Sequence, residues 1–216
     1  EMTSSLVGSE MCIRDRNLED VIALISLYRP GPMDSIPTYL RNRHEPDKIS
    51  YKTPQLAHIL DVTNGCIVYQ EQVMQIFREL AGFSFGQADN VRRAMSKKKV
   101  KDIEKERGAV IRGDASRNIT GCGANGIPEQ TAEAIYNEMY DFANYAFNKA
   151  HSVCYAVIAY QTAWFKCYYP REYMAALMTS VLDSSVKISE YIAECRAMDI
   201  CLLYTSRAHE TRRHLV

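Results

Sequence analysis

Apolar residues recur at helical spacing through most of this chain, and prolines and glycines separate the segments. The apolar side chains between residues 69 and 80 fall on one helical face: Tyr69, Val73, Ile76, Phe77 and Leu80. Gly82 follows where that helix should end, and Ser84 with Gln87 has the spacing of a capping box that opens the next helix. We therefore expect a mainly α-helical protein, an irregular assembly of several helices with little or no sheet.

Other segments fit the same interpretation. A helix is predicted from Asn17 to Leu27, where an Arg-Pro-Gly-Pro turn follows, and another begins near Pro128 after a loop rich in glycine and asparagine. Residues 65–68 read as a short strand or an extended entry to the next helix. Residues 152–168 are apolar on nearly every side, which predicts a central helix surrounded by the others.

Composition excludes several classes of protein. Of the 216 residues, 47% are hydrophobic and 24% are charged, which is too apolar for a disordered chain. Lysine plus arginine equals aspartate plus glutamate, 26 of each, so the bulk charge predicts no nucleic-acid or membrane partner. The sequence contains no stretch typical of a membrane span and no visible secretory signal. The seven cysteines form no C-x-x-C pair, which argues against a zinc ribbon. Their odd number and scattered positions in a chain of this length indicate reduced thiols in a cytoplasmic protein.

The two ends of the chain read as translated sequencing adapter. The DNA word ATG-TGT-ATA-AGA-GAC-AG encodes Met11 to Asp15, and its reverse complement encodes Cys201 to Thr205. We therefore interpret residues 1–16 and 201–216 as adapter-derived tails that are not native, and residues 17–200 as the native piece. The alternative is a genuine N-terminal arm and C-terminal tail.

A basic stretch follows Gly86. Ten basic residues lie there against five acidic ones: Arg92, Arg93, Lys97, Lys98, Lys99, Lys101, Lys105, Arg107, Arg112 and Arg117 against Asp89, Asp102, Glu104, Glu106 and Asp114. Such a surplus on a neutral chain is typical of a surface that meets phosphate, and guanidinium groups suit phosphate oxygens. The alternative is a solvated helix face whose charges pair at i,i+4 spacing.

A second cluster of polar and aromatic residues spans residues 144–151 and continues to Tyr155. Rings to stack on and Asn, Lys and His donors indicate a ligand-facing loop, unless the aromatics pack inward and the polar groups cap helices. The Tyr-Gln-Glu-Gln run at 69–72 consists of either hydrogen-bond network formers or exposed helix formers. His44 and His58 have no partner at metal-ligand spacing, and no Ser-His-Asp arrangement, Walker loop or Asp-x-Asp pair was identified.

Five separated segments of the sequence, called words below, match motifs of one protein family. They are LYRPGPM (27–33), YQEQVMQI (69–76), AGFSFGQADNVRRAMSKKK (81–99), FANYAFNKAHSVCYAVIAYQTAWFK (142–166) and YYPREYMAALM (168–178). Their order and spacing resemble those of the bacterial replicative DNA polymerases of the C family, the alpha subunits of DNA polymerase III. The resemblance implies that residues 17–200 belong to the fingers region, which closes over the incoming nucleotide.

The resemblance also implies a chemistry. A polymerase of this family adds deoxynucleoside monophosphates to a primer end and uses two Mg²⁺ ions held by palm aspartates, which lie upstream of the words found here. This chain would therefore contribute to binding dNTP and template-primer DNA, and it should not extend a primer by itself. For the whole subunit, the resemblance implies a sliding clamp, a clamp loader and a proofreading subunit as partners, in the cytoplasm and with no membrane.

The resemblance implies roles for particular residues within the matching words. The expected nucleotide-binding residues are Arg92, Arg93, Asn148, Lys149, His151 and Tyr155. The expected contacts to phosphate or DNA are Lys97, Lys98 and Lys99, with Arg29 supporting the palm–fingers junction or the nascent base pair. No catalytic or metal-binding residue is expected on this chain. The alternatives are a non-enzymatic helical nucleic-acid-binding module and a helical scaffold with a basic surface.

Overall fold

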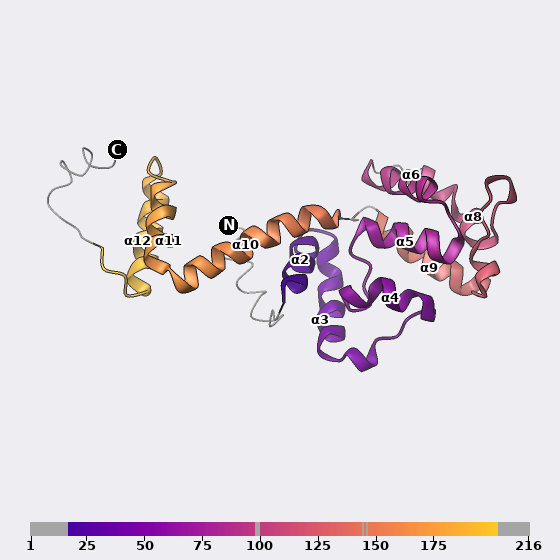
Figure 1. Cartoon of the computed structure of the whole chain (residues 1–216), viewed down its shortest axis with the longest axis horizontal. Helices are drawn as coiled ribbons and strands as arrows, with labels where there is room; N and C mark the ends of the chain where they lie inside the picture. The colour runs from indigo at the N-terminus through magenta and orange to yellow at the C-terminus, as the bar shows by residue number, and fades with distance from the viewer. Residues whose placement is uncertain (1–16, 98–99, 144, 146, 203–216) are drawn as a thin grey trace. The chain divides into compact units, whose positions relative to one another are not determined.

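The computed structural model describes residues 17–97, 100–143, 145 and 147–202. Every regular element within these residues is a helix, and strand-like pairing there is limited to two isolated bridges. The prediction of a mainly α-helical assembly with little or no sheet is therefore confirmed (Figure 1). The adapter-like residues 1–16 and 203–216 lie outside the described residues. In the described part, no helix is both long enough and apolar enough to cross a membrane.

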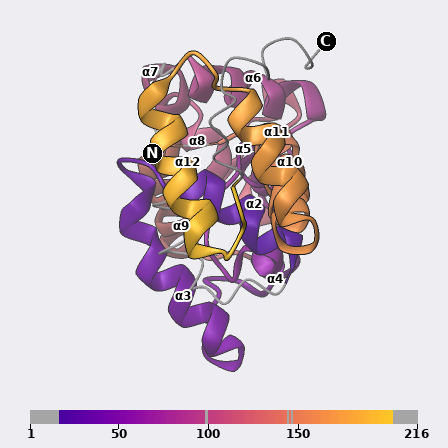
Figure 2. The same cartoon turned by 90° about the vertical axis from the view of Figure 1, so that its left-hand side faces the viewer.

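The chain divides into two units, Glu1–Val157 and Ile158–Val216, and the boundary falls inside α10. The α-helices of the first unit are α2 (Leu18–Leu27), α3 (Ile36–His44), α4 (Ala57–Leu60), α5 (Gln70–Ala81), α6 (Phe85–Ser96), α7 (Val100–Glu104), α8 (Arg107–Arg112), α9 (Glu129–Ala143) and the start of α10 (Lys149–Tyr168). Its 3-10 helices are η1 (Pro32–Ser35), η2 (Pro46–Lys48), η3 (Pro54–Leu56), η4 (Asp61–Thr63), η5 (Ala115–Arg117) and η6 (Cys122–Asn125). The second unit contains the rest of α10, α11 (Pro170–Thr179) and α12 (Ser185–Ala197), and α11 packs against α12 (Figure 2).

The helix ends lie where the local sequence signals predict them. The Asn17 side chain accepts a hydrogen bond of 3.0 Å from the backbone N–H of Asp20 and so caps α2. Gly82 ends α5 with a left-handed φ of 75°, which glycine adopts without steric cost. Ser84 and Gln87 exchange hydrogen bonds of 2.8 and 3.3 Å, and this exchange is the predicted capping box at the start of α6.

The main core of the first unit forms around α5, which packs on α6, α8 and η6 (Figure 1). The apolar face predicted for residues 69–80 is buried throughout. From α9, the helix predicted to begin near Pro128, Ala132, Ile135 and Met139 complete this core. A smaller cluster joins α2, α3 and the start of α10, and it includes Leu27 and Ala156. Residues 66–68 lead into α5 without forming a helix or a strand, and Tyr69, at the helix start, has an extended backbone.

Residues 152–168 lie in a long helix, as predicted, but the expectation that other helices surround it is wrong. In the first unit, only Ser152 and Ala156 of this stretch are fully buried, and Tyr155 is 53% exposed. In the second unit, the Phe165 side chain is 51% exposed. The small side chains let α10 approach α2, where the Oγ atoms of Ser152 and Ser26 lie 2.6 Å apart. An apolar pattern on all sides of a helix does not identify which element will cover it.

Candidate functional site

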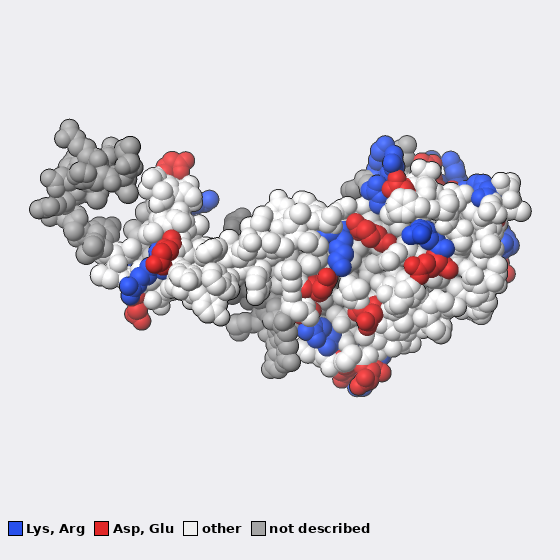
Figure 3. Space-filling model, viewed as in Figure 1, with Lys and Arg blue, Asp and Glu red and all other residues white. Residues whose placement is uncertain are grey.

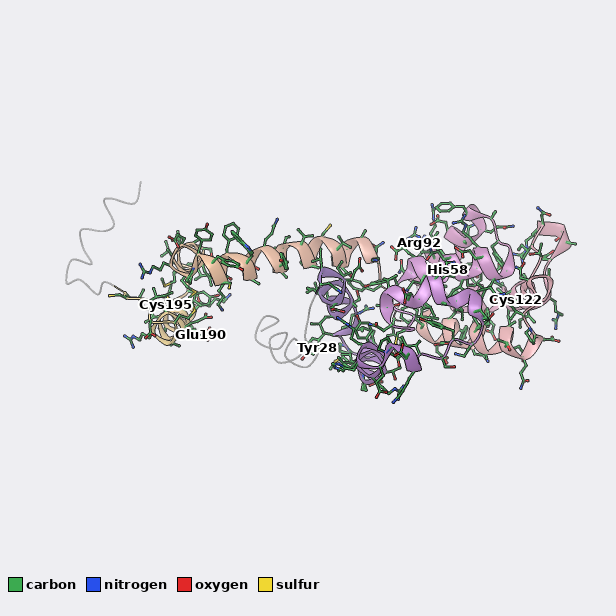
Figure 4. All side chains as sticks on the ribbon, turned by 60° about the horizontal axis from the view of Figure 1, so that its bottom comes forward. Tyr28, His58, Arg92, Cys122, Glu190 and Cys195 are labelled. Carbon is green, nitrogen blue, oxygen red and sulfur yellow. The ribbon has the colours of Figure 1, made fainter. Side chains whose placement is uncertain are left out.

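A cavity of about 600 Å³ lies in the first unit, where α5, α6 and the start of α10 meet. Positive side chains from these three helices line it, namely Arg78, Arg92 and Lys149. His58 also lines the cavity, and Figure 4 labels both His58 and Arg92 in this part of the first unit. The cavity therefore brings together cations that are far apart in the sequence. Such convergence is what binding of a phosphate-bearing ligand requires.

The cavity face of α6 carries Phe85, Asp89 and Arg92, which lie one and two turns apart on the same side of the helix. The Nε atom of Arg92 donates to Asp89 Oδ1 at 2.8 Å, and the Nε atom of Arg93 donates to Asp89 Oδ2 at 2.7 Å. These hydrogen bonds, first from Arg92 and then from Arg93, hold the pKa of the Asp89 carboxyl below its ordinary value. The two arginines are thus ion-paired, and one of them also faces the cavity.

Beyond α6, the basic stretch pairs with neighbouring acidic residues. Arg112 lies 3.5 Å from Glu129 and Arg117 lies 2.8 Å from Glu106. Figure 3 shows lysine and arginine interspersed with aspartate and glutamate on the visible face of the first unit. For this part of the stretch, the structure agrees with the alternative of a solvated, ion-paired surface.

The structure describes one of the three candidate lysines, and that one does not line the cavity. Lys97 is exposed, follows the end of α6 and does not line the cavity. Lys98 and Lys99 lie outside the described residues. The expectation that these lysines contact phosphate or DNA stays a prediction.

The start of α10 is held by contacts from α2 and α5. Asn148 caps the helix by accepting a 3.0 Å hydrogen bond from the backbone N–H of His151. The backbone N–H of Lys149 donates to both carboxylate oxygens of Glu71 at 3.1 and 3.2 Å. The Lys149 Nζ atom lies 3.2 Å from Glu19 and 5.3 Å from the centre of the Tyr69 ring. Both Asn148 and Lys149 therefore line the cavity from a defined position.

Arg29 supports this entry and does not line the cavity. Its Nε atom donates to the Ser26 carbonyl at 2.8 Å, a terminal nitrogen donates to the Tyr145 carbonyl, and its guanidinium carbon lies 4.4 Å from the centre of the Phe147 ring. Burial lowers the pKa of the Arg29 guanidinium. Gly31, two residues further on, has a φ of 101° and lies so close to the Tyr145 ring that a Cβ atom would overlap it. These contacts position the loop before α10.

The aromatic residues at the start of α10 form a continuous ladder. The ring of His151 lies 5.5 Å from that of Phe147 and 4.7 Å from that of Tyr155. His151 and Tyr155 are exposed, and neither lines the cavity. Of the predicted nucleotide-binding residues, Arg92, Asn148 and Lys149 line the cavity, and His151 and Tyr155 belong to the exposed ladder. Arg93 belongs to neither group and is bonded to Asp89.

Within residues 69–72, Glu71 and Gln72 form hydrogen-bond networks, which decides for these two the question that the sequence left open. The Gln72 side chain accepts from the backbone N–H groups of Val68 and Tyr69 and donates to the Ile59 carbonyl and the Thr63 hydroxyl. It is 5% exposed. The entry to α5, and with it the ring of Tyr69 in the cavity, is therefore fixed by a buried amide.

Sequence reasoning missed three acidic residues that organise the candidate site. Asp89 carried a local signal, because it precedes two arginines by three and four residues. Glu19 and Glu71 contact Lys149 from 130 and 78 residues away in the sequence, and no local sequence pattern predicts contacts over such distances. Among the described residues, no group of three or more His, Cys, Asp or Glu side chains is arranged to hold a metal ion.

Comparison with known proteins gives consistent results. Residues 10–118 match the family model described as the bacterial DNA polymerase III alpha subunit finger domain. The DNA polymerase III subunit alpha of Thermus aquaticus is 44% identical over 207 residues, which are 94% of this chain and 16% of that protein. Those of Deinococcus radiodurans and Staphylococcus aureus are 42% and 41% identical over 198 and 191 residues, 88% of this chain in each case.

The chain spans only a small part of these relatives, 14% of the Deinococcus protein and 17% of the Staphylococcus protein. The family model nevertheless covers half of the chain and contains three of the five sequence words, while the words at 142–166 and 168–178 lie outside it. The expected resemblance is confirmed. This chain belongs to the family of bacterial DNA polymerase III alpha subunits, and its matched part is the finger domain.

Proposed function

We propose that the cavity between α5, α6 and α10 binds the triphosphate of an incoming dNTP, as the fingers of a DNA-directed DNA polymerase that replicates the bacterial chromosome. The observation that carries the proposal is the convergence of Arg92 and Lys149 from separate helices on one cavity. Both are cations that suit phosphate oxygens, and Arg92 offers a planar fork of donors.

The exposed ladder next to the cavity fits the remaining part of a nucleotide. His151 and Tyr155 present ring faces on α10, and a nucleobase stacks favourably on such rings. Asn148, which caps the same helix, stands between Phe147 of the ladder and Lys149 in the chain, and it lines the cavity. We assign the ladder to the base or the nascent pair and the cavity to the phosphates.

The described residues do not fit a Mg²⁺ site, because they contain no suitable cluster of metal ligands. We therefore propose that the two Mg²⁺ ions of the complete polymerase are held by palm carboxylates outside this chain, and we assign no bond-making step to these residues. Template-primer DNA is the proposed partner of the region, with Lys97, Lys98 and Lys99 at its backbone. A clamp, a clamp loader and a proofreading subunit are proposed only for the complete cytoplasmic subunit.

The proposal is tested by placing the change equivalent to Arg92→Ala in an intact polymerase of the family. Loss of a charge-assisted hydrogen bond costs about 1–3 kcal/mol, so kcat/KM for dNTP should fall roughly 5- to 150-fold. The matched control is Arg112→Ala, which removes an exposed arginine of α8 that pairs with Glu129. The control should change kcat/KM less than about twofold.

Two results would contradict the proposal. Equal effects of the two changes would show that the cavity has no special part in nucleotide use. The chain could instead bind DNA in a salt-sensitive way that neither nucleotide nor the Arg92 change affects. That result would support the non-enzymatic nucleic-acid-binding module.

We also propose that residues 17–200 are the native piece. If residues 1–16 and 201–216 are translated adapter, a chain lacking both should unfold at the same urea concentration as the full chain. A lower unfolding midpoint after their removal would favour genuine terminal arms.

A further inference from the structure

A single carboxylate, Asp89, bonds both arginines of α6. Consecutive residues on a helix point about 100° apart, so Arg92 and Arg93 would by default diverge. Asp89 precedes them by three and four residues, which places its carboxylate within reach of both side chains. The two hydrogen bonds are 2.8 and 2.7 Å long and use a different carboxylate oxygen for each arginine.

The geometry of these bonds has a consequence for the arginines. Both are made through Nε, the nitrogen nearest the side-chain stem, so each bond restricts the rotation of the guanidinium plane. An arginine has five N–H donors, and a bond through Nε engages one of them. Asp89 itself lines the cavity, so Arg93, which is not a lining residue, is bonded directly to one that is.

We propose that Asp89 is a positioning residue that gathers Arg92 and Arg93 at the cavity edge, so that they bind a triphosphate as one coupled pair. This inference rests on the proposed function, because the ligand is the triphosphate of the incoming nucleotide. Asp89 contributes no contact of its own to the ligand. Its negative charge opposes phosphate binding, and its benefit lies in the orientation of the two cations.

Because of these opposing effects, the ligand affinity of an Asp89 variant is a poor test. Replacing Asp89 removes its repulsion of the phosphates and, at the same time, its orientation of the two arginines. The energetic coupling between the two arginines is the better measure. Side chains that act as a unit give non-additive losses, whereas independent ones give losses that multiply. A carboxylate that merely stabilises the helix surface would not alter this coupling.

The experiment is a double-mutant cycle of Arg92→Ala and Arg93→Ala in the full chain, repeated in the Asp89→Ala background. Dissociation constants for dATP and for inorganic tripolyphosphate are measured by NMR titration, which detects weak binding. With Asp89 present, the increase in dissociation constant of the double variant should differ from the product of the two single-variant increases by about threefold or more. In the Asp89→Ala background, the deviation should fall within experimental error of zero.

Two control variants separate orientation from charge. Asp102→Ala removes the same charge from the basic stretch, but Asp102 pairs with Lys105 and not with the two arginines, so this change should leave the coupling intact. Asp89→Glu keeps a carboxylate in reach of both arginines and should preserve most of the coupling. Far-UV circular dichroism should show unchanged helix content in every variant.

The outcomes distinguish this inference from the proposed function. If Arg92→Ala weakens binding but the coupling survives in Asp89→Ala, or is equally lost in Asp102→Ala, the positioning role is refuted and the cavity assignment stands. If neither arginine affects binding of either probe, the cavity assignment itself fails and the positioning role fails with it.

Discussion

Replacing Gln72 by alanine should strongly destabilise the first unit. The Gln72 amide is 5% exposed and makes hydrogen bonds of 2.9 and 3.0 Å with the backbone N–H groups of Val68 and Tyr69. The alanine variant leaves both buried donors without a partner, at about 1–3 kcal/mol each. The expected loss is therefore roughly 2–6 kcal/mol, a large part of the 5–15 kcal/mol typical of a whole domain.

Urea unfolding of the chain, followed by circular dichroism, measures this loss. The unfolding transition of the first unit should move to a lower urea concentration. Hydrogen exchange locates the loss, because the amides of Val68 and Tyr69 should lose protection first. Gln75→Ala is the matched control, since Gln75 is an exposed glutamine on the same helix. It should cost less than about 0.5 kcal/mol. Equal costs for both variants, with the two amides still protected, would refute the reasoning.

Three other changes follow from the geometry. Gly31→Ala should destabilise the chain by about 1–3 kcal/mol in urea unfolding, because φ is 101° and the new Cβ would overlap the Tyr145 ring. Gly86→Ala should instead stabilise it by up to about 1 kcal/mol in the same assay, since a Cβ atom added to this helical glycine would meet no other atom within 4 Å. Burial raises the pKa of the Cys66 thiol to about 11, so at about pH 8 iodoacetamide should modify the exposed Cys154 well before Cys66, as followed by mass spectrometry. Rapid labelling of Cys66 in the folded chain would contradict its burial.

The amino-acid sequence by itself determined the helices, most of their ends and the family. The apolar face of α5, the Asn17 cap and the Ser84–Gln87 capping box all depend on residues within about one helical turn of each other. Physical interactions over so short a stretch leave a pattern in the sequence that can be read directly. The arginines of α6 were found in the same way, as part of a basic run that stands out on a neutral chain.

Only the tertiary structure decided how these elements meet. It brought the carboxylate of Glu71 to the backbone of Lys149, 78 residues away, and Arg29 to the Tyr145 carbonyl, 116 residues away. It also left most of α10 exposed in each unit, against the expectation from its apolar composition. Such contacts depend on how whole helices pack, and that packing is set by the sum of many distant side chains. No spacing along the chain records that packing, so the cavity and the contacts of Glu19 and Glu71 with Lys149 emerged only once the helices were in place.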